Sequence, residues 1–309
     1  MNEMLMALGG IIGLALLYYG AEYLVRGGSA IASRSRISPL VIGLTLVAFG
    51  TSAPELFVSA GAALQGAGDI CIGNVVGSNI CNIALILGLT GLISPITVNG
   101  ELFRRDLPIM IIVSVLLTAV CIFSGGIGRF VGFLFLAGIA AYTVAGIRSA
   151  SGKGGEQPTS ATCKAASLYV IGGLVALVVG AKLILAAAMT VERHFGVPDE
   201  FVALTVVAVG TSLPELATSI VAAKNGEADI AIGNIVGSNI FNILGILGVS
   251  ALLRPVAIDG MDWVDFGMMI ATAVVLWPLM AARGRLGRME GAFLLAAYGG
   301  YLAWLLHTM

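Results

Sequence analysis

The chain has 309 residues, of which 58% are hydrophobic and 11% are charged, and its formal net charge is -1. Soluble globular proteins carry about 25% charged residues and about 45–50% apolar residues. This composition therefore leaves too little polar surface for a water-soluble globule, and the near-zero charge excludes the basic face of a nucleic-acid-binding protein. The length accommodates about ten membrane spans of about 20 residues each. The sequence predicts an all-α polytopic membrane protein.

The apolar segments between charge clusters and Gly or Pro breaks predict ten membrane-spanning helices. In chain order they lie near residues 4–25, 38–66, 70–94, 107–124, 129–147, 167–190, 198–224, 230–253, 263–282 and 288–307. The first segment lacks the basic stretch and cleavage motif of a signal peptide, so we expect it to be a retained span. The most polar connection, residues 148–166, is rich in Gly and Ser and is typical of a linker.

Lysine and arginine residues are distributed unequally between alternate loops. One set of loops carries Arg26, Arg34, Arg36, Arg104, Arg105, Arg148, Lys153, Lys164, Lys224, Arg283, Arg285 and Arg288. The other set carries only Arg129, Arg193 and Arg254. The positive-inside rule places the first set in the cytoplasm, so both termini are expected outside.

An internal repeat is the strongest feature of the sequence. Residues 44–56 (LTLVAFGTSAPEL) recur at residues 204–216 (LTVVAVGTSLPEL). Residues 69–83 (DICIGNVVGSNICNI) recur at residues 229–243 (DIAIGNIVGSNIFNI). Both recurrences are displaced by 160 residues, and neither alignment needs a gap.

The repeat predicts how the chain is organised in the membrane. If each half holds five spans, an odd number, the second half is inserted upside down relative to the first. We therefore expect two inverted five-helix repeats, residues 1–147 and 167–309, joined by a cytoplasmic linker, residues 148–166. Inverted repeats are a transporter architecture in which the site lies near the bilayer midplane between the halves.

Two glutamates, Glu55 and Glu215, lie in the middle of predicted spans. Ionisable residues at this depth are energetically unfavourable and indicate a functional site. The alternative is a salt bridge inside the bundle, but Lys182 is the only basic residue predicted within a span. One lysine cannot neutralise two symmetric glutamates, and Lys182 aligns in the repeat with Glu22, so both are expected near the membrane interface.

The residues before each glutamate favour a cation site. Pro54 and Pro214 lack an N–H group, so the carbonyls of Gly50 and Gly210 lose their helical partners. Irregular backbone at membrane depth is tolerated where it lines a cavity. Hydroxyl oxygens next to these carbonyls are supplied by Thr51, Ser52, Thr211 and Ser212. For one copy, a kinked helix with Ser/Thr hydrogen bonds would explain the pattern, but two copies that each carry a glutamate favour a site.

The second motif, GNxVGSNIxN, places polar side chains at helical spacing. One face carries Asn74, Ser78 and Asn82, and the matching face carries Asn234, Ser238 and Asn242. The glycines between them permit close contact with another helix. This contact would bring the amide oxygens against the helices that carry the glutamates. For Asn82 and Asn242, interhelical hydrogen bonding alone is the alternative.

The candidate ligands are all oxygen atoms: carboxylates, hydroxyls, carbonyls and amides. Such ligands suit Ca²⁺, Mg²⁺ or Na⁺ rather than transition metals. Ca²⁺ accepts six to eight oxygens in flexible geometry, whereas Mg²⁺ releases its water reluctantly. Two carboxylates balance one Ca²⁺, so calcium is favoured.

The paired motifs GTSAPE with GNVVGSNICN and GTSLPE with GNIVGSNIFN resemble the two alpha-repeats of the cation/calcium exchanger superfamily. The likeness is greatest to its compact prokaryotic sodium/calcium exchangers. The resemblance implies antiport of Na⁺ against Ca²⁺ by alternating access, with two mobile helices sliding past a fixed core. It also implies an integral protein of the prokaryotic plasma (inner) membrane whose partners are its two transported ions and the lipid bilayer, with no cofactor and no obligate protein partner.

The resemblance also implies roles for particular residues. Ca²⁺ would be bound by Glu55 and Glu215 with the carbonyls of Thr51 and Thr211. Na⁺ sites would use the same glutamates with Ala48, Thr51, Ser52 and Ser78 in one half, and with Ala208, Thr211, Ser212 and Ser238 in the other. Asn82 and Asn242 would line the centre. The position of Asn242 can be Asp in potassium-dependent branches, so asparagine there argues against K⁺ co-transport.

Two other functions remain open from the sequence. A Ca²⁺/H⁺ antiporter of the same superfamily is possible because two buried glutamates can carry protons as well as cations. A passive cation channel fits less well, because midplane carboxylates in an inverted repeat favour alternating access. A membrane enzyme lacks support, since no Ser/His pair or HExxH arrangement is present.

Overall fold

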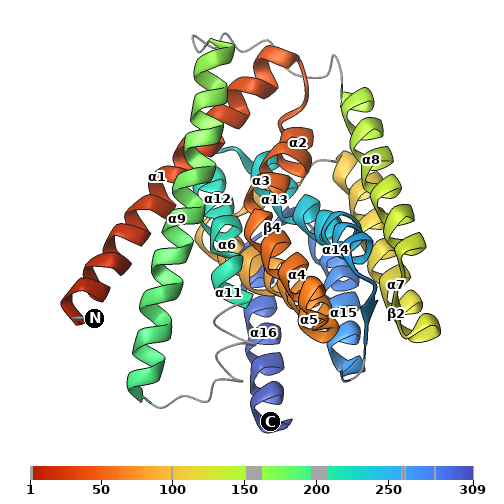
Figure 1. Cartoon of the computed structure of the whole chain (residues 1–309). Helices are drawn as coiled ribbons and strands as arrows, with labels where there is room; N and C mark the ends of the chain where they lie inside the picture. Colours follow the sequence, from red (N-terminus) through yellow and green to blue (C-terminus); the bar gives the residue numbers. More distant parts are fainter. Residues whose placement is uncertain are drawn as a thin grey trace.

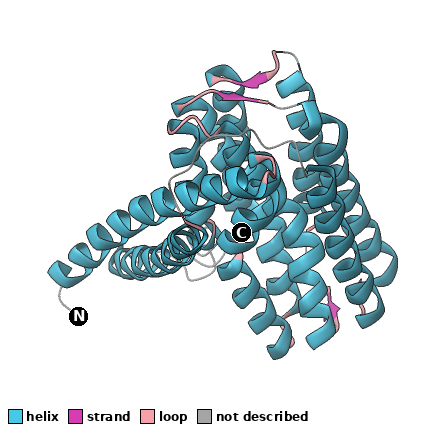
Figure 2. Cartoon of the chain, turned by 90° about the horizontal axis from the view of Figure 1, so that it is seen from above, coloured by secondary structure: helices cyan, strands magenta, loops and turns pink. Residues whose placement is uncertain are grey.

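A computed structural model of the chain describes residues 3–98, 100–150, 162–195, 208–258, 260, 262–281 and 283–308. Nearly all of these residues are helical (Figure 2). The first half contains α1 (Glu3–Ser35), α2 (Pro39–Ile42), η1 (Gly43–Val47), α3 (Ala48–Thr51), α4 (Ala53–Gln65), α5 (Gly68–Ile80), η2 (Cys81–Leu87), α6 (Gly88–Ile93), η3 (Leu102–Asp106), α7 (Leu107–Ser124) and α8 (Arg129–Ala150). The second contains α9 (Cys163–Phe195), α11 (Ala208–Thr211), α12 (Leu213–Lys224), α13 (Ala228–Phe241), η5 (Asn242–Ile246), α14 (Leu247–Leu253), α15 (Trp263–Ala281) and α16 (Arg288–Thr308). Elements named η are π-helical turns.

The helices confirm that the chain is a polytopic helical membrane protein. Within the described residues, 8 helices are long and apolar enough to cross a bilayer. The bent pair Pro39–Thr51 and Ala53–Gln65, with an angle of 50°, would form one further span. The expected helix at 198–224 is described only from Ala208 onward, so the count of ten stays a prediction.

The first helix is longer than predicted, because it continues to Ser35 rather than ending near residue 25. Glu22 and Arg26 form an ion pair of 2.7 Å one turn apart, which lets the helix pass through this charged segment. The helix ends where Arg36 adopts a left-handed conformation, with φ 53°, and the next amide bonds back to the Ala32 carbonyl. The prediction treated the first charges as the helix end, and this was wrong.

Helices α1 and α9 lie side by side and project from the rest of the molecule (Figures 1 and 2). Glycines let their backbones touch: a Cβ atom added at Gly20 would lie 2.9 Å from the Gly173 carbonyl oxygen, and one at Gly13 would lie 2.9 Å from the Gly180 carbonyl oxygen. The contact therefore moves backward along α9 as it moves forward along α1. The two helices, which occupy matching positions in the repeat, run antiparallel.

Two short antiparallel sheets join the halves of the chain. Strand β1 (Ile96–Thr97) pairs with β4 (Arg285–Leu286), and β2 (Gly126–Ile127) pairs with β3 (Val256–Ala257). Each sheet thus takes one strand from each half. The first sheet joins the loops that precede Arg104 and follow Arg283, and the second joins the loops next to Arg129 and Arg254.

The second repeated motif occupies the centre of the molecule. In an 18-residue apolar stretch of Gly68–Ile93 and of Ala228–Leu253, 78% and 83% of the residues are buried inside the protein, against 33% or less in the other candidate spans. α4 packs against α5, and α12 packs against α13. The helices that carry the two motifs are therefore neighbours in each half.

Candidate cation-binding site

The two predicted glutamates occupy matching positions after a break in the backbone. The helix stops at Ser52, with φ -80° and ψ 10°, and at Ser212, with φ -87° and ψ 7°. A proline then lies in the first turn of the next helix, where its missing N–H is tolerated. Glu55 lies in the first turn of α4 and Glu215 in the first turn of α12, and each is 1% exposed.

Each glutamate is hydrogen-bonded by a serine from the other half. The Ser52 hydroxyl donates to Oε1 of Glu215 at 2.8 Å. The Ser212 hydroxyl donates to Oε1 of Glu55 at 3.1 Å. The two carboxylates are also close enough for their charges to interact. The structure therefore brings both glutamates and both serines into one site between the halves.

The remaining carboxylate oxygens have no protein partner. Oε2 of Glu55 and Oε2 of Glu215 are buried without a hydrogen bond. Within the described part of the chain, no lysine or arginine pairs with either glutamate, and Lys182 is exposed. Buried charge without a partner is strongly unfavourable. These oxygens therefore require a cation or a proton.

Four more unpartnered oxygens come from the second motif. The buried atoms without a hydrogen bond include Oγ of Ser78 and Ser238 and Oδ1 of Asn82 and Asn242. The two asparagines lie at the start of the π-helical turns η2 and η5, and such turns are frequent at functional sites. The four residues lie on the central helices that pack against α4 and α12.

The first asparagine of each motif donates hydrogen bonds to the helix that carries the glutamate of the same half. Asn74 donates to the Glu55 carbonyl at 3.3 Å and to the Ser59 hydroxyl at 2.9 Å. Asn234 makes the matching bonds to the Glu215 carbonyl at 3.4 Å and to Ser219 at 3.1 Å. These bonds fix each glutamate helix against the central helix of its own half.

The remaining predicted residues are two threonines and two alanines. Thr51 is buried, and its hydroxyl lies 3.0 Å from Oδ1 of Asn234 in the other half. Thr211 is buried near the Glu55 carboxylate. Ala48 is buried at the start of α3, whereas only the backbone of Ala208 is described, at the start of α11.

Two residues at the centre were missed by sequence reasoning. Asn79 and Asn239 are each 1% exposed, and Asn79 donates to the Asn239 backbone carbonyl at 3.2 Å. They lie within the repeated motif, directly after Ser78 and Ser238, and the repetition itself was a signal that could have identified them. They lie outside the helical spacing that selected the other three polar positions.

The arrangement supplies oxygen ligands and little else. Among the described residues, no group of three or more His, Cys, Asp or Glu could hold a metal ion. Carboxylate, hydroxyl and amide oxygens without protein partners suit a hard cation such as Ca²⁺ or Na⁺. The donor set therefore fits the ions expected from the sequence.

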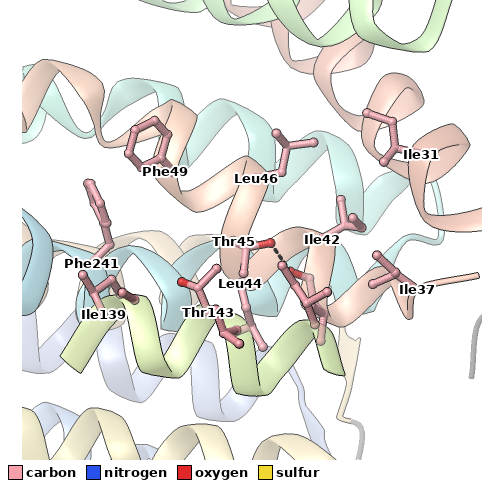
Figure 3. Close-up of a pocket in the computed structure, with 14 residues that line it drawn as sticks. Ile31, Ile37, Ile42, Leu44, Thr45, Leu46, Phe49, Ile139, Thr143 and Phe241 are labelled. Atoms are coloured by element: carbon pink, nitrogen blue, oxygen red, sulfur yellow. Dashed lines mark hydrogen bonds between the residues drawn. The ribbon is translucent and has the colours of Figure 1, made fainter. Parts of the chain in front are cut away.

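A separate cavity of about 660 Å³ is lined by residues of α1, α2, η1, α3, α8 and α13 (Figure 3). Phe49 and Phe241 lie at one end of it, with ring centroids 5.0 Å apart, and Thr45 bonds back to the Val41 carbonyl. Its lining is almost entirely aliphatic or aromatic and includes none of the predicted site residues. This cavity is suited to hydrocarbon and not to ions.

Comparison with known proteins identifies the family. The family described as sodium/calcium exchanger protein matches residues 5–147 and 165–307. The putative antiporter CaxA of Alkalimonas amylolytica is 40% identical, over 94% of this chain and 95% of that protein. The sodium/calcium exchanger MaX1 of Methanosarcina acetivorans is 34% identical, over 96% of this chain and 97% of that protein. A solved structure of the sodium-calcium exchanger NCX_Mj matches with a TM-score of 0.85 and 33% identity, covering 97% of this chain and 98% of that chain. The chain belongs to the sodium/calcium exchanger family.

Proposed function

We propose that the protein is a secondary antiporter that exchanges Na⁺ for Ca²⁺ across the membrane by alternating access. The observation that carries the proposal is the set of buried, unpartnered oxygens at Glu55 and Glu215 and on the central helices beside them. These oxygens can replace the hydration shell of a cation at the boundary between the halves. The exchangers among its relatives support the same activity.

In the proposed site, each half contributes one glutamate and a matching set of ligands. Glu55 and Glu215 bind Ca²⁺ with the carbonyls of Thr51 and Thr211. The same glutamates share Na⁺ sites with hydroxyls and carbonyls on both sides, and the two central asparagines complete the pocket. The further Na⁺ ligands are Ala48, Ser52 and Ser78, with Ala208, Ser212 and Ser238, and the asparagines are Asn82 and Asn242.

The proposed architecture is ten spans in two inverted five-helix repeats. Its support is that α1 and α9, which occupy matching positions, run antiparallel. The reciprocal serine–glutamate bonds and the strand pairs between the halves are the contacts that a two-fold axis produces. Such repeats surround a midplane site in transporters.

The proposed orientation places both termini outside. Strand pairing groups the loop of Arg104 with the loop of Arg283, and the loop of Arg129 with that of Arg254. This grouping agrees with the two sets of loops that differ in positive charge. The first turn of α1 and the last turn of α16 both lie toward the lower end of Figure 1.

The test is Ca²⁺ uptake into liposomes that contain the purified protein. Na⁺ is loaded inside, Na⁺-free buffer with labelled Ca²⁺ is added outside, and a protonophore collapses any pH gradient. We expect the outward Na⁺ gradient to drive uptake, and Glu55→Gln to abolish it. Uptake that follows an imposed pH gradient and ignores Na⁺ would replace the proposal with Ca²⁺/H⁺ antiport, and uptake that needs no counter-ion would indicate a channel.

A further inference from the structure

Asn79 on α5 and Asn239 on α13 are in contact at the boundary between the halves. Each accepts a hydrogen bond from a central asparagine of the other half. Asn82 donates through Nδ2 to Oδ1 of Asn239 at 3.0 Å. Asn242 donates through Nδ2 to Oδ1 of Asn79 at 3.0 Å. Because the amino groups of Asn82 and Asn242 are used in this way, their oxygens face elsewhere and are buried without a partner.

A methionine on a neighbouring helix lies beside the amino group of each amide, and the amino group of Asn79 also donates to the Asn239 backbone carbonyl at 3.2 Å. Nδ2 of Asn239 lies 3.5 Å from Sδ of Met110 on α7, and Nδ2 of Asn79 lies 4.0 Å from Sδ of Met269 on α15. Both methionines are almost completely buried. A thioether sulfur accepts a hydrogen bond but cannot donate one. The amino group of each amide therefore faces sulfur, and its oxygen faces the asparagine of the other half.

The reverse orientation is disfavoured at every position. If Asn239 turned over, its oxygen would face the Met110 sulfur and its amino group would face the amino group of Asn82. If Asn82 turned over, two amide oxygens would face each other. Buried polar groups without a complementary partner are unfavourable. The Met110 sulfur thus sets the direction of the Asn239 amide and, through it, of the Asn82 amide. In the other pair, the Met269 sulfur and the Asn239 carbonyl together set the direction of the Asn79 amide.

We propose that Met110 and Asn239, with their counterparts Met269 and Asn79, are positioning residues that point the oxygens of Asn82 and Asn242 toward the transported cations. The inference rests on the proposed function and adds to it, since these four residues do not touch the ion. They prevent an N–H₂ group, which repels cations, from entering the site. The sequence pattern alone offers no reason for a methionine at either position.

The first test compares Met110→Leu with Met280→Leu. Both remove a fully buried methionine sulfur and keep a side chain of similar volume, but no hydrogen bond to Met280 is found among the described residues. Loss of the partner behind a metal ligand typically lowers affinity by about 10–100-fold. The measured quantity is the Ca²⁺ concentration that gives half of the ligand-dependent rise in Tm. We expect this concentration to be about tenfold higher in Met110→Leu than in the wild type. Met280→Leu should leave that concentration unchanged.

A second measurement separates orientation from packing. Met110→Leu, Asn239→Leu and the double variant are titrated with Ca²⁺ alone and with Na⁺ alone. Because Met110 acts through Asn239, the two effects on cation affinity should not add. A purely structural role would lower the Tm of the ion-free protein and leave the cation midpoint where it was. If Asn239→Leu does not fold, Met269→Leu replaces it: this methionine contacts Asn79, so its loss should raise the cation midpoint as Met110→Leu does, and an unchanged midpoint in both variants would contradict the positioning role.

The outcomes distinguish this inference from the proposed function. If Met110→Leu has the same cation midpoint as Met280→Leu, or if the two effects add, the positioning role is wrong even when Na⁺-driven uptake is normal. If the wild-type protein instead follows a pH gradient, the proposed function is wrong, while the Ca²⁺ titration still decides the positioning role.

Discussion

Ser52 donates a hydrogen bond of 2.8 Å to Oε1 of Glu215, although the two residues lie in different halves of the chain. The reciprocal bond joins Ser212 to Glu55 at 3.1 Å. Each carboxylate is therefore oriented by the half that does not carry it. A substitution in one half should change the ion ligands of both halves, and this relation is the basis for the first two predictions.

Glu55→Gln and Glu215→Gln should each reduce Na⁺-driven Ca²⁺ uptake to near background. Each keeps the shape of the side chain but leaves one positive charge of Ca²⁺ uncompensated in a buried site, which costs several kcal/mol. The measurement is initial uptake at matched protein content. Asp262→Asn, an exposed residue, is the control and should retain uptake. Near-normal uptake in both glutamate variants would contradict the central site.

Ser52→Ala and Ser212→Ala should weaken Na⁺ dependence by similar amounts. A hydrogen bond to a charged group contributes about 1.5–3 kcal/mol, and a factor of ten in affinity corresponds to about 1.4 kcal/mol. We therefore expect the Na⁺ concentration for half-maximal exchange to rise at least about tenfold in each variant. Ser114→Ala, which removes a buried hydroxyl bonded within α7, is the control. A shift in one serine variant but not the other would contradict the reciprocal arrangement.

Asn242→Asp should change which cations accompany exchange. It adds a third carboxylate near two others, and mutual repulsion must be relieved by a proton or by a further monovalent cation. Exchange in the variant should therefore depend on K⁺, or it should fall steeply as the pH rises from about 6 to 8 and the added carboxyl loses its proton. The wild type should show neither effect. The measurement is Na⁺-driven Ca²⁺ exchange across this range with and without K⁺. Superimposable curves for variant and wild type would show that Asn242 does not face the ions.

Gly173→Ala should destabilise the protein, whereas Gly172→Ala should not. A Cβ atom at Gly173 would lie 2.7 Å from the Gly20 carbonyl oxygen, but one at Gly172 meets nothing within 4 Å. Overpacking of this kind costs about 1–3 kcal/mol, because α1 and α9 must separate. Thermal unfolding of the two neighbouring variants in the same detergent measures the difference. Equal Tm values would mean that the glycine contact between the helices does not hold them together.

The sequence predicted much of the fold and most of the candidate site, and the family resemblance is confirmed. The composition predicted membrane-spanning helices, and the repeat selected Glu55, Glu215 and the polar faces of the central helices as candidates. Periodicity describes one face of one helix, so it could not show that Ser52 bonds to the glutamate of the other half rather than its own. For the same reason it missed Met110 and Met269, whose sulfurs meet Asn239 and Asn79 only because helices distant in the chain pack together.

The reciprocal bonds between the halves also bear on how such a chain can originate. An isologous interface satisfies the same groups whether its two sides belong to one chain or to two identical ones. A half-length ancestor inserted in both orientations could therefore have built the serine–glutamate pairs as an antiparallel homodimer. Within a single chain, by contrast, the two halves can carry different residues at matching positions. Ser29 now bonds to Glu227 at 2.7 Å, while the matching positions of the repeat carry Met189 and Ala67, and an alanine side chain has no group that could form that bond.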